Sequence, residues 1–422
     1  MNTSLLYGKK GLDIELPDRT KVIEPKHIPG LGEKEKEEAF QAMKKPTGQK
    51  PLKECVNANE TVAIVISDST RPTPNHKLIP WILEELNHVP NEQFVIINGT
   101  GSHRDNTYAE LCEMLGKEVV DSVRVINNQA FDPSTQAYLG TSSTGAEIYL
   151  NKEYVEADRK IVTGFIEPHF FAGFSGGPKG IMPGIAGIDT IMHFHSAKMI
   201  AHPMSTWRIL KDNPVQGEAT EITCMAKPDF MLNVALNKEK EITAFFAGDV
   251  VEAHREGCKY VKEHAMAPCE ERFDIVITSN SGYPLDQNLY QAVKGMSAAQ
   301  KIVKEGGAIL CAAECSDGLP DHGNYADILK ECSTPQDLID MINDPNYSKF
   351  DQWQVQKQAM IQVWSDVYVY STLQAADLEA AMLSPIRNME ETIQNIIKEK
   401  GGQASIAIMP QGPLTIPYIE NE

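Results

Sequence analysis

Short runs of apolar residues alternate along the chain with stretches in which apolar residues recur every three or four positions. The runs are nearly continuous, which is typical of strands buried on both faces of a sheet, and the periodic stretches are typical of amphipathic helices. Strands are predicted over residues 61–67, 94–97, 160–165, 273–279, 308–312 and 367–370, and helices over 75–87, 108–115, 250–263 and 389–400. This alternation predicts an α/β fold with mainly parallel sheets flanked by helices.

A chain of 422 residues is long for a single domain, so two domains are expected. The last helical pattern before residue 264 gives way to a segment containing Pro268, which cannot continue a helix. A boundary is therefore predicted near 266–272, between an N-terminal domain (1–267) and a C-terminal α/β domain (270–402), although an ordinary helix-to-strand connection would look the same. A final strand over 405–409 needs a partner sheet, so residues 403–422 are expected to complete the N-terminal domain.

Composition excludes several classes of function. The net charge of −19 is unsuited to a nucleic-acid partner, since phosphate binding needs a basic surface. No signal-peptide core stands at the N-terminus, and no apolar run is long enough to cross a bilayer. The eight cysteines are scattered without a CxxC pair, which is typical of reduced thiols. A cytoplasmic protein that contacts no membrane is expected.

Three predicted strands run directly into polar or glycine-containing turns. The first is followed by Asp68 and Arg71, the second by His103 and the third by His169. Ligands of open α/β sheets gather outside the carboxyl ends of the strands, so these side chains form one candidate site. Arg71 could form bidentate hydrogen bonds to a carboxylate or phosphate. Alternatively, Asp68 could simply cap the helix that follows.

The most distinctive segment is residues 167–184, which we call the glycine-rich segment. It places five glycines around Lys179, and successive exposed amides in such a turn can cradle an anion. A nucleotide-binding P-loop is the obvious alternative, but Pro178 stands where its second glycine is required and Gly180 where its hydroxyl residue is required. The segment therefore indicates a ligand site of another kind.

Histidines supply the remaining chemistry. His103, His169 and His195 could together hold a zinc ion with a bound water, although no paired-ligand spacing supports this. A zinc-dependent hydrolase, and a non-catalytic protein that binds nucleotides or organic acids, therefore stay as alternatives. A further helix brings residues 290, 291 and 294 to one side, which by itself is ordinary amphipathic spacing.

Taken together, the segments 67–72, 101–104, 167–179 and 192–195 resemble the nickel-dependent lactate racemase family. The similarity extends over nearly the whole chain, and the run Pro168 to Lys179 is its most specific part. The resemblance implies two α/β domains with the active site in the cleft between them. It also implies a nickel pincer nucleotide, a pyridinium-3,5-bisthiocarboxylate mononucleotide joined covalently to Lys179.

The resemblance further implies a role for each candidate residue. Nickel is expected on His195 rather than on His193, and His103 and His169 are expected to be the general acid/base pair. The cofactor is expected to contact Asp68, Ser69, Thr70 and Arg71, and the substrate to contact Arg71, Gln291, Lys294, Tyr290 and Trp353.

These roles suit the racemisation or epimerisation of a small 2-hydroxy acid, with lactate as the first candidate. Proton removal from C2 is difficult because that C–H is weakly acidic, whereas hydride removal yields a planar 2-keto acid and the cofactor carries the difficult step. Two histidines are needed, one for the hydroxyl of each enantiomer. The oligomeric state and transient contacts with cofactor-synthesis proteins are left open.

Overall fold

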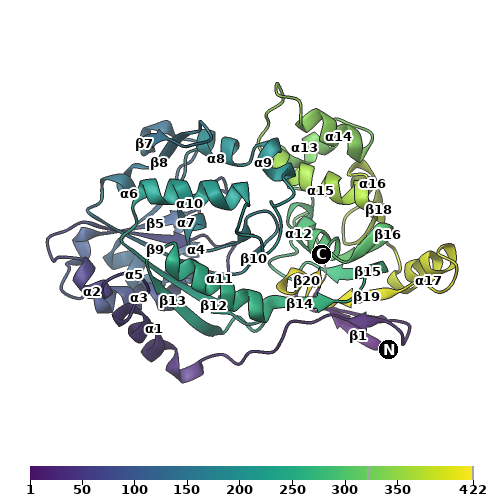
Figure 1. The fold of residues 1–422 in the computed structure, drawn as a ribbon, viewed down its shortest axis with the longest axis horizontal. Coiled ribbons are helices and arrows are strands. Elements are labelled where there is room, and N and C mark those ends of the chain that lie inside the picture. The colour runs from purple at the N-terminus through teal and green to yellow at the C-terminus, as the bar shows by residue number, and fades with distance from the viewer. Residues whose placement is uncertain (321–322, 421–422) are drawn as a thin grey trace. The chain divides into compact units, whose positions relative to one another are not determined.

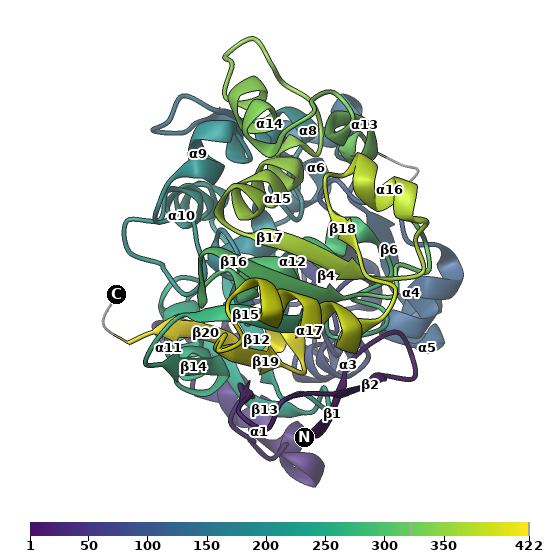
Figure 2. The ribbon, with the colours of Figure 1, turned by 90° about the vertical axis from the view of Figure 1, so that its right-hand side faces the viewer.

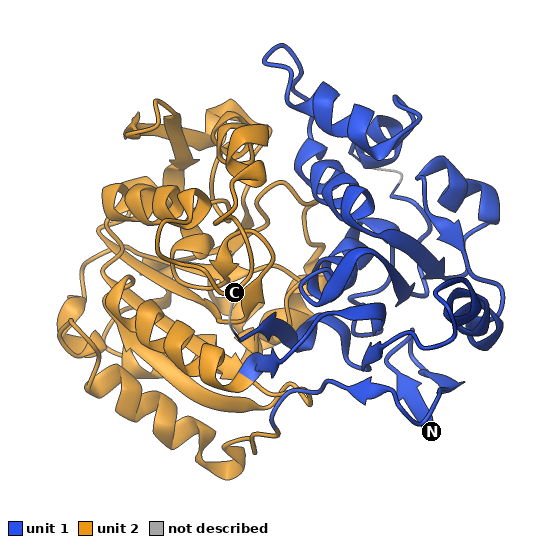
Figure 3. Ribbon diagram, turned by 45° about the vertical axis from the view of Figure 1, so that its right-hand side comes forward, with its two compact units in different colours: residues 1–26, 265–422 blue, residues 27–264 orange. Residues whose placement is uncertain are grey.

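The computed structural model describes residues 1–320 and 323–420. The chain divides into two compact units, one formed by His27–His264 and the other by Met1–Lys26 together with Ala265–Glu422 (Figure 3). Each unit contains one six-stranded sheet flanked by helices. The predicted α/β class with two domains is therefore confirmed.

The sheet of the His27–His264 unit has the order β13-β12-β9-β4-β5-β6, of which Figure 1 labels β13, β12, β9 and β5. Its strands are β4 (Val62–Ser67), β5 (Phe94–Gly99), β6 (Arg124–Asn127), β9 (Arg159–Phe165), β12 (Phe230–Leu236) and β13 (Ile242–Gly248). All neighbours are parallel except the edge strand β13, which runs antiparallel to β12. The apolar runs lie buried in the middle of this sheet, as continuous apolar strands require.

Helices cover this sheet with the apolar sides that the sequence pattern predicts. Helix α3 (Asn75–Glu85) contributes Leu78, Ile79 and Ile82 to the same cluster as Ile64 and Ile161 of the strands. Helix α4 (Tyr108–Leu115) starts where Thr107 and Glu110 form a reciprocal capping box. The helices are thus positioned by burial on one face and by caps at their ends.

Strand order determines where a ligand can reach this unit. From β4 the chain moves outward to β5 and β6, and it then returns to the other side of β4 as β9 and β12. The direction reverses between β4 and β9, and the carboxyl ends at such a switch point diverge to leave a crevice. The segments that follow β4, β5 and β9 all leave from this edge, so Asp68, His103 and the glycine-rich segment belong to one region of the fold.

The second unit is built on a sheet of order β18-β17-β16-β15-β19-β3, in which all neighbours are parallel. Its strands are β3 (Lys21–Val22), β15 (Phe273–Ser279), β16 (Val303–Ala312), β17 (Asp366–Tyr370), β18 (Ser384–Pro385) and β19 (Ile406–Met409). Helix α17 (Met389–Glu399) buries Ile393 and Ile396 against Ile275, Leu310 and Ile408. Helices α12 (Leu289–Ala299) and α15 (Gln352–Trp364) also contact this sheet (Figure 2).

The structure corrects the expected division of the chain. Residues 403–422 do not complete the N-terminal domain, because β19 pairs with β15 in the second unit. The first 26 residues also belong to that unit, where β3 pairs with β19. The chain returns from the His27–His264 unit to the second unit at Ala265. This boundary lies immediately before β14 (Met266–Cys269), which pairs with β20 (Ile416–Ile419). A short apolar strand needs partners on both sides, and its sequence does not specify which of two similar sheets supplies them.

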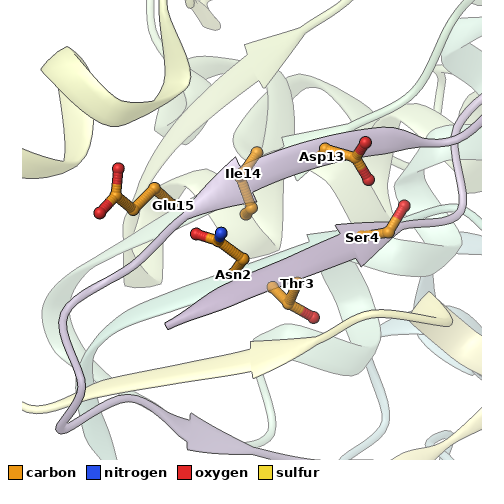
Figure 4. A pocket seen from close by; sticks show the side chains of 6 residues that line it. All are labelled: Asn2, Thr3, Ser4, Asp13, Ile14 and Glu15. Carbon is orange, nitrogen blue, oxygen red and sulfur yellow. The ribbon is translucent and has the colours of Figure 1, made fainter.

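No helix in the described part of the chain is long and apolar enough to span a bilayer. An open hollow lies along the hairpin of β1 (Asn2–Leu5) and β2 (Leu12–Glu15), as Figure 4 shows. Its lining contains none of the residues that the sequence singled out.

Candidate active site

The turn after β4 is organised around the buried carboxylate of Asp68. One carboxylate oxygen, Oδ1, accepts a hydrogen bond from the hydroxyl of Thr70 at 2.7 Å, and the other, Oδ2, lies 2.7 Å from Nδ1 of His103. Burial by itself would raise the pKa of Asp68, but the charge and hydrogen bond of His103, with help from Arg71 and Thr70, lower it. Asp68 is therefore an ionised group that holds one nitrogen of the His103 ring.

His103 follows β5 on a turn that glycine makes possible. Gly101 has a φ of +54°, and its amide donates to the carbonyl of Gly184 at 2.9 Å. The amide of Gly184 in turn donates to the carbonyl of Lys179 at 3.3 Å. The turn that bears His103 therefore rests directly on the end of the glycine-rich segment. The His103 side chain is 37% exposed, so it can meet a ligand from solvent.

An asparagine network beneath this turn was not identified from the sequence. Asn98 and Asn127 join Asn106, whose side-chain amide donates to the hydroxyl of Ser69 at 2.7 Å. The side-chain oxygen of Asn106, Oδ1, also accepts a hydrogen bond from the backbone amide of Ser69 at 3.2 Å. The turn that carries Asp68, Ser69, Thr70 and Arg71 is thus held by a buried polar network as well as by its own backbone.

The glycine-rich segment begins with a small hairpin, β10 (Pro168–His169) and β11 (Gly173–Phe174). The His169 ring is buried, and its Nδ1 accepts the amides of Phe171 and Ala172 at 3.5 and 3.3 Å. Gly173 has a φ of +79°, and a β-carbon there would lie 2.2 Å from the carbonyl oxygen of Ile209. The hairpin geometry therefore requires glycine at this position.

A tight turn then presents Lys179. Gly177 has φ and ψ of 48° and −119°, near the values of the first central residue of a type II′ turn, and the Lys179 amide closes the turn on the Gly176 carbonyl at 3.0 Å. The Gly177 amide donates to Oδ1 of Asn233 on β12 at 2.7 Å. The ring of His254 packs where a β-carbon of residue 177 would stand. Asn233 and His254 are far away in the sequence, and sequence reasoning did not find them.

The Lys179 ammonium lies over two aromatic rings, 5.4 Å from the centre of Phe171 and 5.8 Å from that of Phe194. The Phe171 ring also contacts the rings of His169 and His195, with centroid separations of 4.5 and 5.5 Å. Phe171 is therefore the common neighbour of three predicted site residues. The structure brings Lys179, His169 and His195 together around it.

The structure distinguishes His195 from His193. His195 follows helix α8 (Ile188–Phe194), is buried, and donates from Nδ1 to the carbonyl of Ile191 at 3.1 Å. Burial, followed by the charge of Lys179, lowers the pKa of His195 to about 3, so the ring is neutral and Nε2 carries its lone pair. His193 instead points to Thr144, with 3.0 Å between Nε2 and the hydroxyl.

Four residues that are predicted to contact the substrate lie in the unit that contains Ala265–Glu422, and these are Tyr290, Gln291, Lys294 and Trp353. Asn288 caps helix α12 through the amide of Gln291, and the Lys294 ammonium donates to the side-chain oxygen of Gln291 at 2.7 Å. The indole of Trp353 donates to the hydroxyl of Tyr290 at 3.1 Å. The structure therefore joins these residues in two pairs, each held in a fixed orientation.

No three His, Cys, Asp or Glu side chains are gathered to hold a metal ion in the parts of the chain that the structure describes. The three histidines that could have formed a zinc centre each use Nδ1 in a different contact. Nδ1 of His103 faces Asp68, Nδ1 of His169 accepts two backbone amides, and Nδ1 of His195 donates to a backbone carbonyl. Metal-bound histidines also make such contacts with their second ring nitrogen, so it is the lack of a gathered ligand set in the described residues that does not favour a zinc-dependent hydrolase.

Family models match the lactate racemase N-terminal domain over residues 7–208 and the lactate racemase C-terminal domain over 269–416. A lactate racemase of Lactiplantibacillus plantarum is 37% identical over 382 residues, covering 90% of each chain. Another from Thermoanaerobacterium thermosaccharolyticum is 33% identical, covering 97% of this chain and 98% of that protein.

Solved structures agree with these sequence matches. The lactate racemase apoprotein of T. thermosaccharolyticum superposes with a TM-score of 0.92 at 32% identity, covering 99% of this chain and 100% of that one. A Thermotoga maritima protein with a TM-score of 0.71 and 20% identity, covering 91% of this chain and 98% of that one, shares the fold. The proteins named lactate racemase are isomerases, and the chain belongs to the lactate racemase family.

Proposed function

We propose that the chain interconverts the enantiomers of lactate, or of a closely related 2-hydroxy acid, through a 2-keto acid. The observation that carries this proposal is the group of Lys179, His169 and His195 around Phe171, of which all but His195 lie on the segment that most resembles the family. Membership of a family whose named members are lactate racemases supports the same reaction.

The residues present fit a nickel pincer nucleotide joined to Lys179. His195 offers the lone pair of Nε2, because its Nδ1–H is already donated to the Ile191 carbonyl, and a fixed second nitrogen is usual for a metal-bound histidine. The side-chain amide nitrogen of Asn233 is buried beside the glycine-rich segment and meets no hydrogen-bond acceptor among the described residues, so a polar ligand could satisfy it. When bound, the cofactor would take the hydride from C2 of the substrate and return it.

Protein side chains would supply the remaining functions. His103 and His169 would exchange the hydroxyl proton with the substrate on its two sides, as acid and base. Arg71, Gln291 and Lys294 would hold the substrate carboxylate, and Tyr290 and Trp353 would also contact the substrate. The planar guanidinium of Arg71 is suited to bidentate hydrogen bonding with a carboxylate. Asp68, Ser69 and Thr70 would contact the cofactor. The cleft between the domains and the cytoplasmic location stay predictions.

Mass spectrometry of protein matured together with the cofactor-synthesis proteins tests the covalent link. The expected result is a mass adduct on a peptide containing Lys179, which disappears in Lys179→Ala and persists in the control Lys198→Ala, a change at an exposed lysine on helix α9 (Ala197–Ala201). Fully active protein with an unmodified Lys179 would contradict the proposal.

A racemase assay then tests the reaction. Single enantiomers of lactate, malate and longer aliphatic or aromatic 2-hydroxy acids are incubated with the matured protein, and optical rotation or chiral chromatography is followed. Racemisation of at least one of these acids is expected, with metal analysis showing nickel. Activity restored by zinc alone, without a bound chromophore, would instead support the hydrolase alternative.

A further inference from the structure

The two histidines assigned to proton exchange are held in opposite ways. The Asp68 carboxylate can only accept hydrogen bonds, and it lies 2.7 Å from Nδ1 of His103. Nδ1 of His103 must therefore carry a hydrogen. In the neutral ring this leaves Nε2 of His103 with its lone pair, since a neutral imidazole has one protonated nitrogen.

His169 presents the opposite arrangement. Its Nδ1 faces the backbone amides of Phe171 and Ala172, and a backbone amide can only donate. Nδ1 of His169 is therefore an acceptor, and the hydrogen of the neutral ring lies on Nε2.

The surrounding backbone prevents the His169 contacts from being exchanged easily. The turn is closed by the pairing of His169 with Gly173 and by the Phe174 amide, which donates to the Ala172 carbonyl at 3.0 Å. A ring flip would place a carbon atom against the two amides and leave buried donors without an acceptor, which is unfavourable. For His103, a flip would place a carbon against the ionised Asp68.

We propose that the two histidines rest in opposite tautomers, so that Nε2 of His103 is a proton acceptor while Nε2 of His169 is a hydrogen-bond donor. The tautomers themselves are inferred from the hydrogen bonds, and only their role in proton transfer rests on the proposed function. A hydroxyl facing His103 transfers its proton to Nε2, so that the O–H bond breaks, an N–H bond forms, and the resulting cation keeps its Nδ1–H on Asp68. A hydroxyl or carbonyl oxygen facing His169 meets a donor instead. With both rings neutral, the protein is thus prepared to accept a proton on one side only.

Nuclear magnetic resonance of the apoprotein tests this directly. With ¹⁵N-labelled histidine, long-range ¹H–¹⁵N correlations distinguish the protonated from the unprotonated ring nitrogen, at a pH where both rings are neutral. Signals are assigned by their loss in His103→Phe and in His169→Phe. The expected result is a protonated Nδ1 in His103 and a protonated Nε2 in His169. The same tautomer in both rings overturns the proposal.

A variant pair tests the cause. In Asp68→Leu no acceptor remains at this position for Nδ1–H, so the fraction of His103 protonated at Nδ1 is expected to decrease while His169 keeps its pattern. The control Asp105→Leu, at an exposed position on the same turn, should leave both rings unchanged. A His103 ring that stays protonated at Nδ1 to the same extent in folded Asp68→Leu contradicts the role of Asp68. If Asp68→Leu does not fold, the wild-type spectrum alone decides.

Because these measurements use apoprotein and no substrate, their outcome is independent of the racemase assay. A protein with opposite tautomers and no racemase activity would refute the proposed function alone. An active racemase with matching tautomers would refute this inference alone.

Discussion

Replacement of Gly177 by alanine tests how the fold presents Lys179. Gly177 has a φ of +48°, which only glycine adopts readily, and holding another residue there costs about 1–3 kcal/mol. The new β-carbon would lie 2.5 Å from the Cγ atom of His254, and such overpacking costs a further 1–3 kcal/mol or so. The variant should therefore lose roughly 2–6 kcal/mol of stability, which is a large part of the stability of a typical domain.

Differential scanning calorimetry of the apoprotein measures this loss. For a unit of this size each kcal/mol lowers the Tm by roughly 2–4 °C, so a decrease of about 4–24 °C is expected in the transition of the His27–His264 unit. Gly217→Ala is the matched control. Gly217 lies inside helix α10 (Pro214–Ala226), where a β-carbon meets nothing within 4 Å, so alanine should raise stability by about 0.5–1 kcal/mol.

A double variant tests the contribution of the His254 ring to this loss. His254→Ala removes the ring that the new β-carbon would strike, together with the hydrogen bond between Nε2 and the Ser175 carbonyl at 2.9 Å. Gly177→Ala should therefore cost less in the His254→Ala background. The β-carbon of residue 254, which lies 2.8 Å from the new one, remains, so the residual loss combines the backbone strain with this smaller steric clash. A Gly177→Ala protein that melts within a degree of the parent would refute the reasoning, because it would show that the turn tolerates an ordinary residue.

Three other perturbations have defined outcomes. A hydrogen bond from Arg159 lowers the pKa of Glu60 from 4.5 to about 2, so the ion pair stabilises the fold above the unfolded pKa and this contribution is lost as the pH falls towards 2. Glu60→Gln should therefore flatten that part of a plot of Tm against pH. An unchanged plot contradicts the assignment. His195→Ala should abolish nickel retention by matured protein while His193→Ala retains it, as measured by elemental analysis, and equal nickel in both would exclude His195 as the ligand. Lys294→Met should raise KM for the substrate at least about tenfold, since a hydrogen bond to a charged group contributes roughly 1.5–3 kcal/mol, and an unchanged KM would remove Lys294 from the carboxylate site.

Much of the fold could be predicted because its signals are local. Buried parallel strands need continuous apolar runs, so β4, β9 and β15 lie where those runs occur in the sequence. Helix α4 covers 108–115 as predicted because its cap and its apolar spacing are both encoded within a few residues. The same logic predicted that the turns after successive strands would lie at one edge of the sheet.

The partner of the last strand could not be predicted in this way. The run Ile406–Met409 is suitable for either sheet, and its place beside β15 depends on pairing between residues more than a hundred positions apart. The asparagine network around Asn106 has the same character, because its members lie on separate strands and turns. Such contacts leave no periodic signal in the sequence.

By itself, the sequence determined the fold class, the segments that carry chemistry and the family. Only the tertiary structure decided that His195 rather than His193 has a buried ring with its Nδ1 bound to a carbonyl, and that Asn233 and His254 support the turn before Lys179. The tertiary structure also gave His103 a carboxylate and His169 two amides as partners. The physical reason is that burial and hydrogen-bond polarity are set by whatever the fold places beside a side chain, whereas helix and strand patterns are set by close neighbours along the chain.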